Sequence, residues 1–171
     1  LWRRHGARGA ASYEAEARSI ARLFLTPTSR NLVRVFFLQD RLKALGAGST
    51  RQVERVHVVG AGLMGGDIAA WCAWRGLEVT LQDREQRFVD AALERARALF
   101  ARKGRRAGQA AACEARLKPD LAGAGVAGAD VVIEAIVEDA DAKRALYRQL
   151  EPAMKPGALL ATNTSSLALE D

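Results

Sequence analysis

The chain has 171 residues, of which 49% are apolar and 27% are charged, a composition that excludes a disordered chain and a membrane-embedded one. Its formal net charge of +6 would suit a nucleic-acid binder. Residues 1–56, however, carry 11 basic and 4 acidic side chains (+7), whereas residues 57–171 carry 15 and 16 (−1). The excess charge is confined to the N-terminal segment, so we expect no nucleic-acid partner.

Cysteine content and hydropathy narrow the class further. The two cysteines, Cys72 and Cys113, are far apart and show no metal-ligand spacing, which excludes a disulfide framework and predicts no metal site. No apolar run reaches the roughly 18 residues of a membrane span, and residues 1–6 lack the pattern of a signal peptide. We expect a protein of a reducing compartment, the cytoplasm, with an organellar matrix as the open alternative.

Residues 12–45 predict two helices separated by a turn. Ser12 is the expected cap of the first helix, and Thr26-Pro27 opens the second with an N-cap threonine and a proline at the first helical position. Gly46 is a natural stop. Residues 47–50 read as a short linker, so we place a boundary between a helical linker segment, 1–50, and a domain, 51–171.

After this boundary, short β-branched runs alternate with helical stretches. The expected strands are 53–59, 77–81, 131–135 and 158–162, with a weak one near Leu117. The expected helices are 62–75, 84–103 and 139–151, and the second of them turns Phe88, Leu93 and Leu99 inward. Strands that alternate with helices predict βαβ units, and hence an α/β fold with a doubly wound parallel sheet.

Residues 60–65, Gly-Ala-Gly-Leu-Met-Gly, form a G-x-G-x-x-G motif between an expected strand and an expected helix. In a dinucleotide-binding turn the first glycine permits the sharp bend, the second admits a pyrophosphate, and the third lets the helix pack closely on the strand. Free N–H groups at the helix start hold the negative charge. The alternative is a glycine-rich turn without a ligand. The residues assigned to the cofactor here are Gly60, Gly62, Leu63, Met64 and Gly65.

Asp83 lies at the end of the second expected strand, 23 positions after Gly60. A carboxylate there accepts hydrogen bonds from both hydroxyls of an adenosine ribose and repels a 2′-phosphate, so it favours NAD over NADP. Two alternatives stay open. In one, Asp83 caps a helix that begins at Arg84; in the other, Arg84 and Arg87 meet the 2′-phosphate of NADP.

With this motif in place, three blocks of the sequence resemble the NAD-binding domain of the 3-hydroxyacyl-CoA dehydrogenases, in the family's order. They are residues 56–66 (VHVVGAGLMGG), 132–138 (VIEAIVE) and 162–167 (TNTSSL). The resemblance extends over residues 53–171. It implies a Rossmann-type fold, NAD as cofactor, and oxidation of 3-hydroxyacyl-CoA by hydride transfer in fatty-acid β-oxidation. It also assigns the nicotinamide half of the cofactor to Ala135, Ile136, Glu138, Lys143 and Asn163, and the substrate hydroxyl to Ser165.

Local interpretations without a ligand also fit several residues. Glu138-Asp139 suits the acidic start of a helix, and Thr164-Ser165-Ser166 suits an ordinary helix cap. Trp71 and Trp74 are expected to pack in the first helix of the domain. A basic segment follows the second helix, either as a solvated helix end or as a contact for the adenosine phosphates of coenzyme A, which the resemblance implies. Its cations are Arg102, Lys103, Arg105 and Arg106.

Residues 17–45 resemble the connector between the enoyl-CoA hydratase and dehydrogenase halves of multifunctional fatty-acid oxidation proteins. We therefore expect a piece of such a protein, preceded by a hydratase-like domain and followed by the helical C-terminal dehydrogenase domain. The family's catalytic base is a histidine, and neither histidine here fits it. His57 is expected in a strand, as a core or edge residue, and His5 lies in the basic segment. We expect cofactor binding with little or no turnover.

Two other functions stay open. The same fold and motif serve NAD-dependent dehydrogenases of other hydroxy acids. Alternatively, the basic N-terminal helices form a non-catalytic module for nucleic acid or a membrane surface. The many apolar residues between 32 and 45 argue against that second function, because a helix that binds a charged surface is mostly polar.

Overall fold

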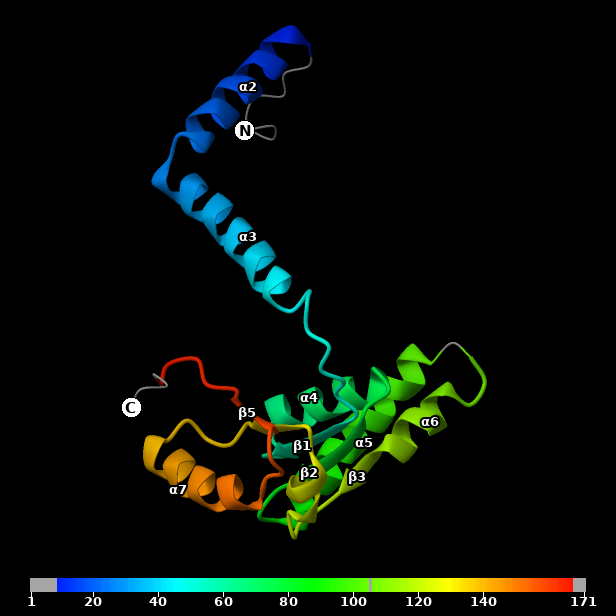
Figure 1. Ribbon diagram of the computed structural model, residues 1–171. Helices are drawn as coiled ribbons and strands as arrows, with labels where there is room; N and C mark the ends of the chain where they lie inside the picture. Colours follow the sequence, from blue (N-terminus) through cyan, green and yellow to red (C-terminus); the bar gives the residue numbers. More distant parts are fainter. Residues whose placement is uncertain (1–8, 105, 168–171) are drawn as a thin grey trace. The chain divides into compact units, whose positions relative to one another are not determined.

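The computed structural model describes residues 9–104 and 106–167, which divide into two compact units between Arg51 and Gln52. The first unit holds two helices, α2 (Ala10–Phe24) and α3 (Pro27–Leu45), drawn in blue and cyan in Figure 1. The predicted cap of α3 is confirmed, because the hydroxyl of Thr26 accepts a hydrogen bond from the N–H of Ser29 at 3.2 Å.

The predicted start of α2 is wrong. Its N-cap is Gly9, which places Ser12 inside the helix. Alanine is the strongest helix former, and the alanines at positions 10 and 11 extend the helix past the serine. Apolar side chains of both helices stay exposed, among them the rings of Phe36 and Phe37, which meet edge to face with 5.6 Å between their centroids.

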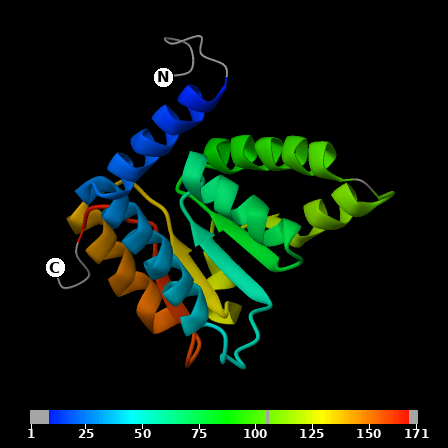
Figure 2. The same cartoon turned by 90° about the horizontal axis from the view of Figure 1, so that it is seen from above.

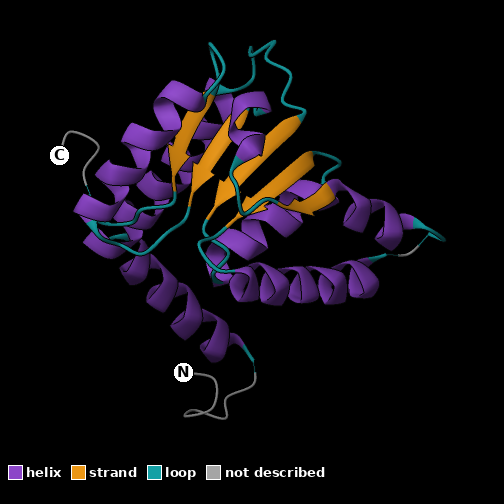
Figure 3. Ribbon diagram, turned by 90° about the horizontal axis from the view of Figure 1, so that it is seen from below, coloured by secondary structure: helices purple, strands orange, loops and turns teal. Residues whose placement is uncertain are grey.

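The second unit is built on a sheet of five parallel strands in the order β3-β2-β1-β4-β5, shown in orange in Figure 3. This confirms the predicted α/β fold and doubly wound parallel sheet. The order reverses between β1 and β4, and ligands bind at the carboxyl ends of the strands at such a reversal. The strands are β1 (Arg55–Val59), β2 (Glu78–Gln82), β3 (Leu117–Pro119), β4 (Val131–Glu134) and β5 (Leu159–Thr162).

Helices cover both faces of this sheet. On one face lie α4 (Leu63–Trp74) and α5 (Gln86–Lys103), and on the other lies α7 (Ala140–Leu150), as Figure 2 shows. The short α6 (Gln109–Arg116) follows α5 and leads into β3. Two 3₁₀ turns, at Ala124–Gly128 and Glu151–Ala153, complete the unit. In the part of the chain that the structure describes, no helix is both long enough and apolar enough to be a membrane span.

The inward face of α5 differs from the prediction by one position. Phe88 is 40% exposed, whereas Val89 and Phe100 are fully buried. Leu93 and Leu99 are half-buried against the same core. The reason is the close approach of α4, where a Cβ on Gly66 would lie 2.9 Å from the Cβ of Ala92. Small residues are needed at this contact, so alanines occupy the centre of the face and the larger residues lie beside it.

Candidate functional site

The Gly-rich turn joins β1 to α4. Gly60 has φ of 106°, and a Cβ there would lie 2.5 Å from the carbonyl oxygen of Ala135. A Cβ on Gly65 would lie 1.8 Å from the carbonyl oxygen of Gly60. The fold itself therefore requires these two glycines. A Cβ on Gly62, by contrast, would meet no atom within 4 Å, so this glycine leaves space in front of the turn for something else.

The first turn of α4 is open to an anion. Gly62 is its N-cap residue and provides no side-chain cap for the N–H groups. The next two side chains, Leu63 and Met64, are 71% and 59% exposed. Uncapped N–H groups and the positive end of the helix dipole attract phosphate.

Asp83 follows β2 and contacts this turn. Its Oδ2 accepts a hydrogen bond of 2.7 Å from the N–H of Ala61, and its Oδ1 accepts one of 2.7 Å from the N–H of Arg84. The alternative that Asp83 caps the next helix is wrong, because α5 begins at Gln86 with Glu85 as its N-cap residue. The half-buried carboxylate is thus held at the edge of the turn.

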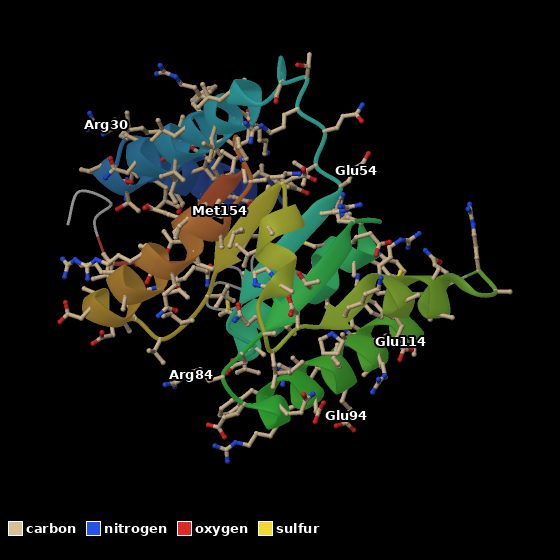
Figure 4. All side chains as sticks on the ribbon, turned by 60° about the horizontal axis from the view of Figure 1, so that its bottom comes forward. Arg30, Glu54, Arg84, Glu94, Glu114 and Met154 are labelled. Carbon is tan, nitrogen blue, oxygen red and sulfur yellow. The ribbon has the colours of Figure 1, made fainter. Side chains whose placement is uncertain are left out.

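The two arginines of the NADP alternative differ in their surroundings. Arg84 is exposed on the connection between β2 and α5, where Figure 4 labels it. Arg87 pairs with Glu85, with 2.8 Å between Nε and Oε2, and its guanidinium lies 4.8 Å from the ring centroid of Phe88. Arg87 is therefore engaged locally on α5.

Arg95, on α5, is a contact of the turn that the sequence did not indicate. Its Nη2 donates to the carbonyl oxygen of Gly62 at 3.0 Å and lies 3.5 Å from that of Ala61. A Cβ on Gly66 would lie 2.8 Å from this same Nη2. Gly66 thus makes room for the guanidinium, and the guanidinium holds the carbonyl side of the turn. No periodicity distinguishes this arginine from the others of α5.

A buried carboxylate, Glu134, ends β4 on the other side of the order reversal. Its side chain is fully buried and accepts hydrogen bonds from Thr162 Oγ1 at 2.6 Å and from Tyr147 Oη at 2.9 Å. The ammonium of Lys143 donates to both of its oxygens at 2.9 Å. The residues come from β4, α7 and β5, so this cluster ties three elements together.

Lys143 also reaches the surface loop. Its Nζ lies 3.2 Å from Oε2 of Glu138, although the lysine is only 3% exposed. Glu138 in turn accepts hydrogen bonds from the hydroxyl of Thr164, from the N–H of Ser165 at 3.3 Å and from the hydroxyl of Ser166 at 3.1 Å. Segment 162–167 is therefore anchored to segment 132–138 through Glu138.

These contacts shift the pKa values of Glu134, Glu138 and Lys143 in favour of their charged forms. The hydrogen bond from Thr164, with the further ones from Lys143 and Ser166, lowers the pKa of Glu138 to about 2. Burial alone would raise the pKa of Glu134, but its hydrogen bonds from Thr162, Lys143 and Tyr147 outweigh burial and lower it. Burial would lower the pKa of Lys143, and the two carboxylates raise it instead. The cluster therefore carries two carboxylates and one ammonium near neutral pH.

The remaining candidates lie at the same edge of the sheet. Ala135 donates its N–H to the carbonyl oxygen of Val59, and Asn163 donates its N–H to that of Glu134, both at 2.8 Å. Ile136 is half-buried, whereas Asn163 and Ser165 are exposed. Thr164 Oγ1 accepts a hydrogen bond from the N–H of Leu167 at 3.1 Å, and the helix that this threonine would cap lies outside the described residues.

The basic segment begins in the last turn of α5, which includes Arg102 and Lys103. Arg102 and Arg106 are exposed, and Lys103 lies with its Nζ 4.5 Å from the ring centroid of Trp71. Arg105 lies outside the described residues. The predicted packing role is confirmed for Trp74, because its ring stacks on that of Phe100 with 6.4 Å between the centroids. It is wrong for Trp71, which is 42% exposed.

His57 is the core residue that the sequence predicts. It is fully buried in β1, with Nδ1 2.7 Å from Thr80 Oγ1 and Nε2 3.0 Å from Gln82 Oε1. Both ring nitrogens are therefore occupied. His5 lies outside the described residues. Within the described ranges, no three His, Cys, Asp or Glu side chains gather into a group that could hold a metal ion.

Comparison with known proteins agrees with this geometry. Residues 55–171 match the model of the 3-hydroxyacyl-CoA dehydrogenase NAD-binding domain. The chain belongs to this family. The alpha subunit of the fatty acid oxidation complex of Psychrobacter arcticus is 31% identical over 163 residues, which are 91% of this chain and 23% of that protein. The chain thus contains the NAD-binding domain of the family and spans about a quarter of the curated relatives that it matches.

Solved structures of the family share the fold. The 3-hydroxybutyryl-CoA dehydrogenase of Escherichia coli K12 superposes with a TM-score of 0.66 and 34% identity, over 70% of this chain and 26% of that one. The dehydrogenase part of multifunctional enzyme 1 of C. elegans superposes with a TM-score of 0.60 and 26% identity, over 70% and 28% of the two chains. Both support the Rossmann-type assignment, and the match to the NAD-binding domain over residues 55–171 supports NAD as the cofactor.

Proposed function

We propose that NAD binds across the carboxyl ends of β2, β1, β4 and β5, with its pyrophosphate on the N–H groups of the Gly-rich turn. Asp83 would accept the hydroxyls of the adenosine ribose. Glu138 and Asn163, with Ala135, Ile136 and Lys143 behind them, would receive the nicotinamide half. The observation that carries this proposal is the open first turn of α4, with Asp83 hydrogen-bonded to its edge.

The whole protein would be an NAD-dependent dehydrogenase that oxidises a 3-hydroxyacyl-CoA to the 3-oxoacyl-CoA. The nicotinamide supplies a hydride acceptor when bound. Ser165, exposed on the loop that Glu138 holds, would donate or accept a hydrogen bond at the substrate hydroxyl. The reaction needs a base for the hydroxyl proton, and His57 is buried with both ring nitrogens occupied. This chain by itself would therefore bind cofactor without turning over substrate.

The partners and the location are part of the same proposal. We infer a multifunctional protein of the bacterial cytoplasm, in which residues 1–50 link this domain to a hydratase-like one. The support is the 91% of the chain that aligns with a fatty acid oxidation alpha subunit. We also propose that Arg102 and Arg106, both exposed, contact the adenosine phosphates of coenzyme A, since guanidinium groups bind phosphates well.

Titration of the purified chain with NADH and NADPH, followed by cofactor fluorescence, tests the proposal. We expect saturable NADH binding, and NADPH binding that is at least about tenfold weaker because Asp83 repels a 2′-phosphate. Absence of saturable NADH binding, or a preference for NADPH, would overturn it.

A further inference from the structure

Glu134 has no role in the proposed contacts with the cofactor, yet it is the most highly coordinated side chain of the site. Its two carboxylate oxygens accept five hydrogen bonds, two from Lys143 and one each from Tyr147, Thr162 and the N–H of Ile136. Its side chain is fully buried. A carboxylate with this many donors has a single fixed position.

The contacts of Glu134 continue to the surface without a break. The Lys143 ammonium has three N–H donors. Two of them point to the oxygens of Glu134, and the remaining one faces Glu138 at 3.2 Å. Glu138 then holds Thr164 and the N–H of Ser165. The position of the loop after β5 thus depends on Lys143, and that of Lys143 depends on Glu134.

Net stability does not explain such a pair. The attraction between a buried carboxylate and a buried ammonium offsets little more than the free energy lost when both groups leave water. Apolar residues of similar size often replace such a pair without loss of stability. What a buried pair fixes is geometry. Here the fixed groups lie at β4 and β5, on the opposite side of the order reversal from Asp83. A dinucleotide bound across that reversal places its second mononucleotide there.

We propose that Glu134 is a positioning residue for the nicotinamide half of NAD. Through Lys143 it holds Glu138 and residues 163–166 in the arrangement that receives the nicotinamide riboside. This inference rests on the proposed function. It predicts that Glu134 affects only ligands that carry the nicotinamide group.

The test compares NADH with ADP-ribose, which keeps the adenosine and pyrophosphate and lacks the nicotinamide. In Glu134→Gln, one acceptor oxygen and the negative charge are lost while the side-chain volume is kept. We expect NADH affinity to fall by about tenfold or more, the value of a lost charged hydrogen bond, and ADP-ribose affinity to stay within about twofold. Asp83→Asn is the matched control, because it should weaken both ligands.

A second variant keeps the test valid if Glu134→Gln does not fold. Tyr147→Phe removes one donor to Glu134 while Lys143 and Glu138 are kept, and it should also lower NADH affinity selectively. Equal loss of both ligands, or loss of neither, in a folded variant would overturn the positioning role alone. If the unaltered chain binds neither ligand, the proposed function is overturned and the positioning role with it.

Discussion

The N–H of Ala61 donates a hydrogen bond of 2.7 Å to Oδ2 of Asp83, 22 positions further along the chain. The Gly-rich turn and the acidic residue after β2 are separate features of the sequence, and this bond makes them one surface. In the proposed complex, a carboxylate that the turn orients would meet a ribose whose pyrophosphate lies on the same turn. Preorganisation of this kind reduces the cost of ordering side chains on binding.

Asp83→Asn should weaken NADH binding by about tenfold to a hundredfold. A hydrogen bond to a charged group contributes about 1.5–3 kcal/mol, and the amide offers the ribose only one acceptor. NADPH should lose less affinity, because the repulsion of its 2′-phosphate is removed at the same time. Fluorescence titration measures both constants. Asp90→Asn, at an exposed position of α5, should change neither. An unchanged NADH constant in Asp83→Asn would contradict the assignment.

Alanine at two glycines should separate folding from binding. A Cβ on Gly65 would lie 1.8 Å from a backbone oxygen, whereas one on Gly62 meets nothing within 4 Å. Gly65→Ala should therefore lower the free energy of unfolding by about 1–3 kcal/mol or more. Gly62→Ala should unfold like the unaltered chain and lose NADH binding, because only the ligand needs its space. Urea unfolding and NADH titration test the pair, and normal NADH binding by Gly62→Ala would count against the site.

Arg95→Met should loosen the Gly-rich turn. The guanidinium donates to the carbonyl oxygen of Gly62 at 3.0 Å, and a hydrogen bond from a charged group contributes about 1.5–3 kcal/mol. We expect faster hydrogen–deuterium exchange in residues 60–66 and weaker NADH binding. Arg97→Met is the control, since Arg97 is exposed and pairs with Glu114 on α6. If the two variants exchange alike, Arg95 has no special role in the turn.

His57 should make the unfolding free energy depend on pH. Burial lowers its pKa from 6.5, against the opposing effects of Gln82 and of Asp120, whose Oδ2 lies 3.8 Å from Nδ1. The unfolded chain then binds the proton more readily than the folded one. The free energy of unfolding therefore keeps its full value, as far as His57 is concerned, above about pH 6.5, and it falls as the pH drops below that value.

Urea unfolding between pH 5 and pH 8 measures this slope. His57→Gln keeps a donor and an acceptor toward Thr80 and Gln82 but does not titrate, so its stability should vary less over the same range. Equal slopes for the two proteins would assign the pH dependence to other groups.

Much of this fold follows from the sequence. The β-branched runs and helical stretches predict the parallel strands, because each crossover between parallel strands needs a connection of helical length, and the central strand β1 is buried on both faces from Val56 to Val59. The glycines at 60 and 65 fulfil the steric roles that the motif predicts. The strands, the helices and the two glycines are predictable because each depends on residues that are close together in the chain.

The contacts between residues that are far apart in the chain cannot be predicted from the sequence. Glu134 lies in a β-branched strand, where nothing in the spacing announces a buried carboxylate, and its partner Lys143 lies nine positions away on another element. Arg95 is one of several arginines on α5 and acts on a turn 33 positions earlier. Phe88 is predicted to point inward, yet it is 40% exposed and its neighbour Val89 is buried instead. Packing between elements decides each case.

A crystal structure of this chain with NADH tests the central claim most directly. The account predicts the pyrophosphate within hydrogen-bonding distance of the N–H groups of residues 62–64, the adenosine ribose on Asp83, and the nicotinamide over Glu138 and Asn163. Density for the cofactor away from the Gly-rich turn, or a ribose out of reach of Asp83, would contradict it.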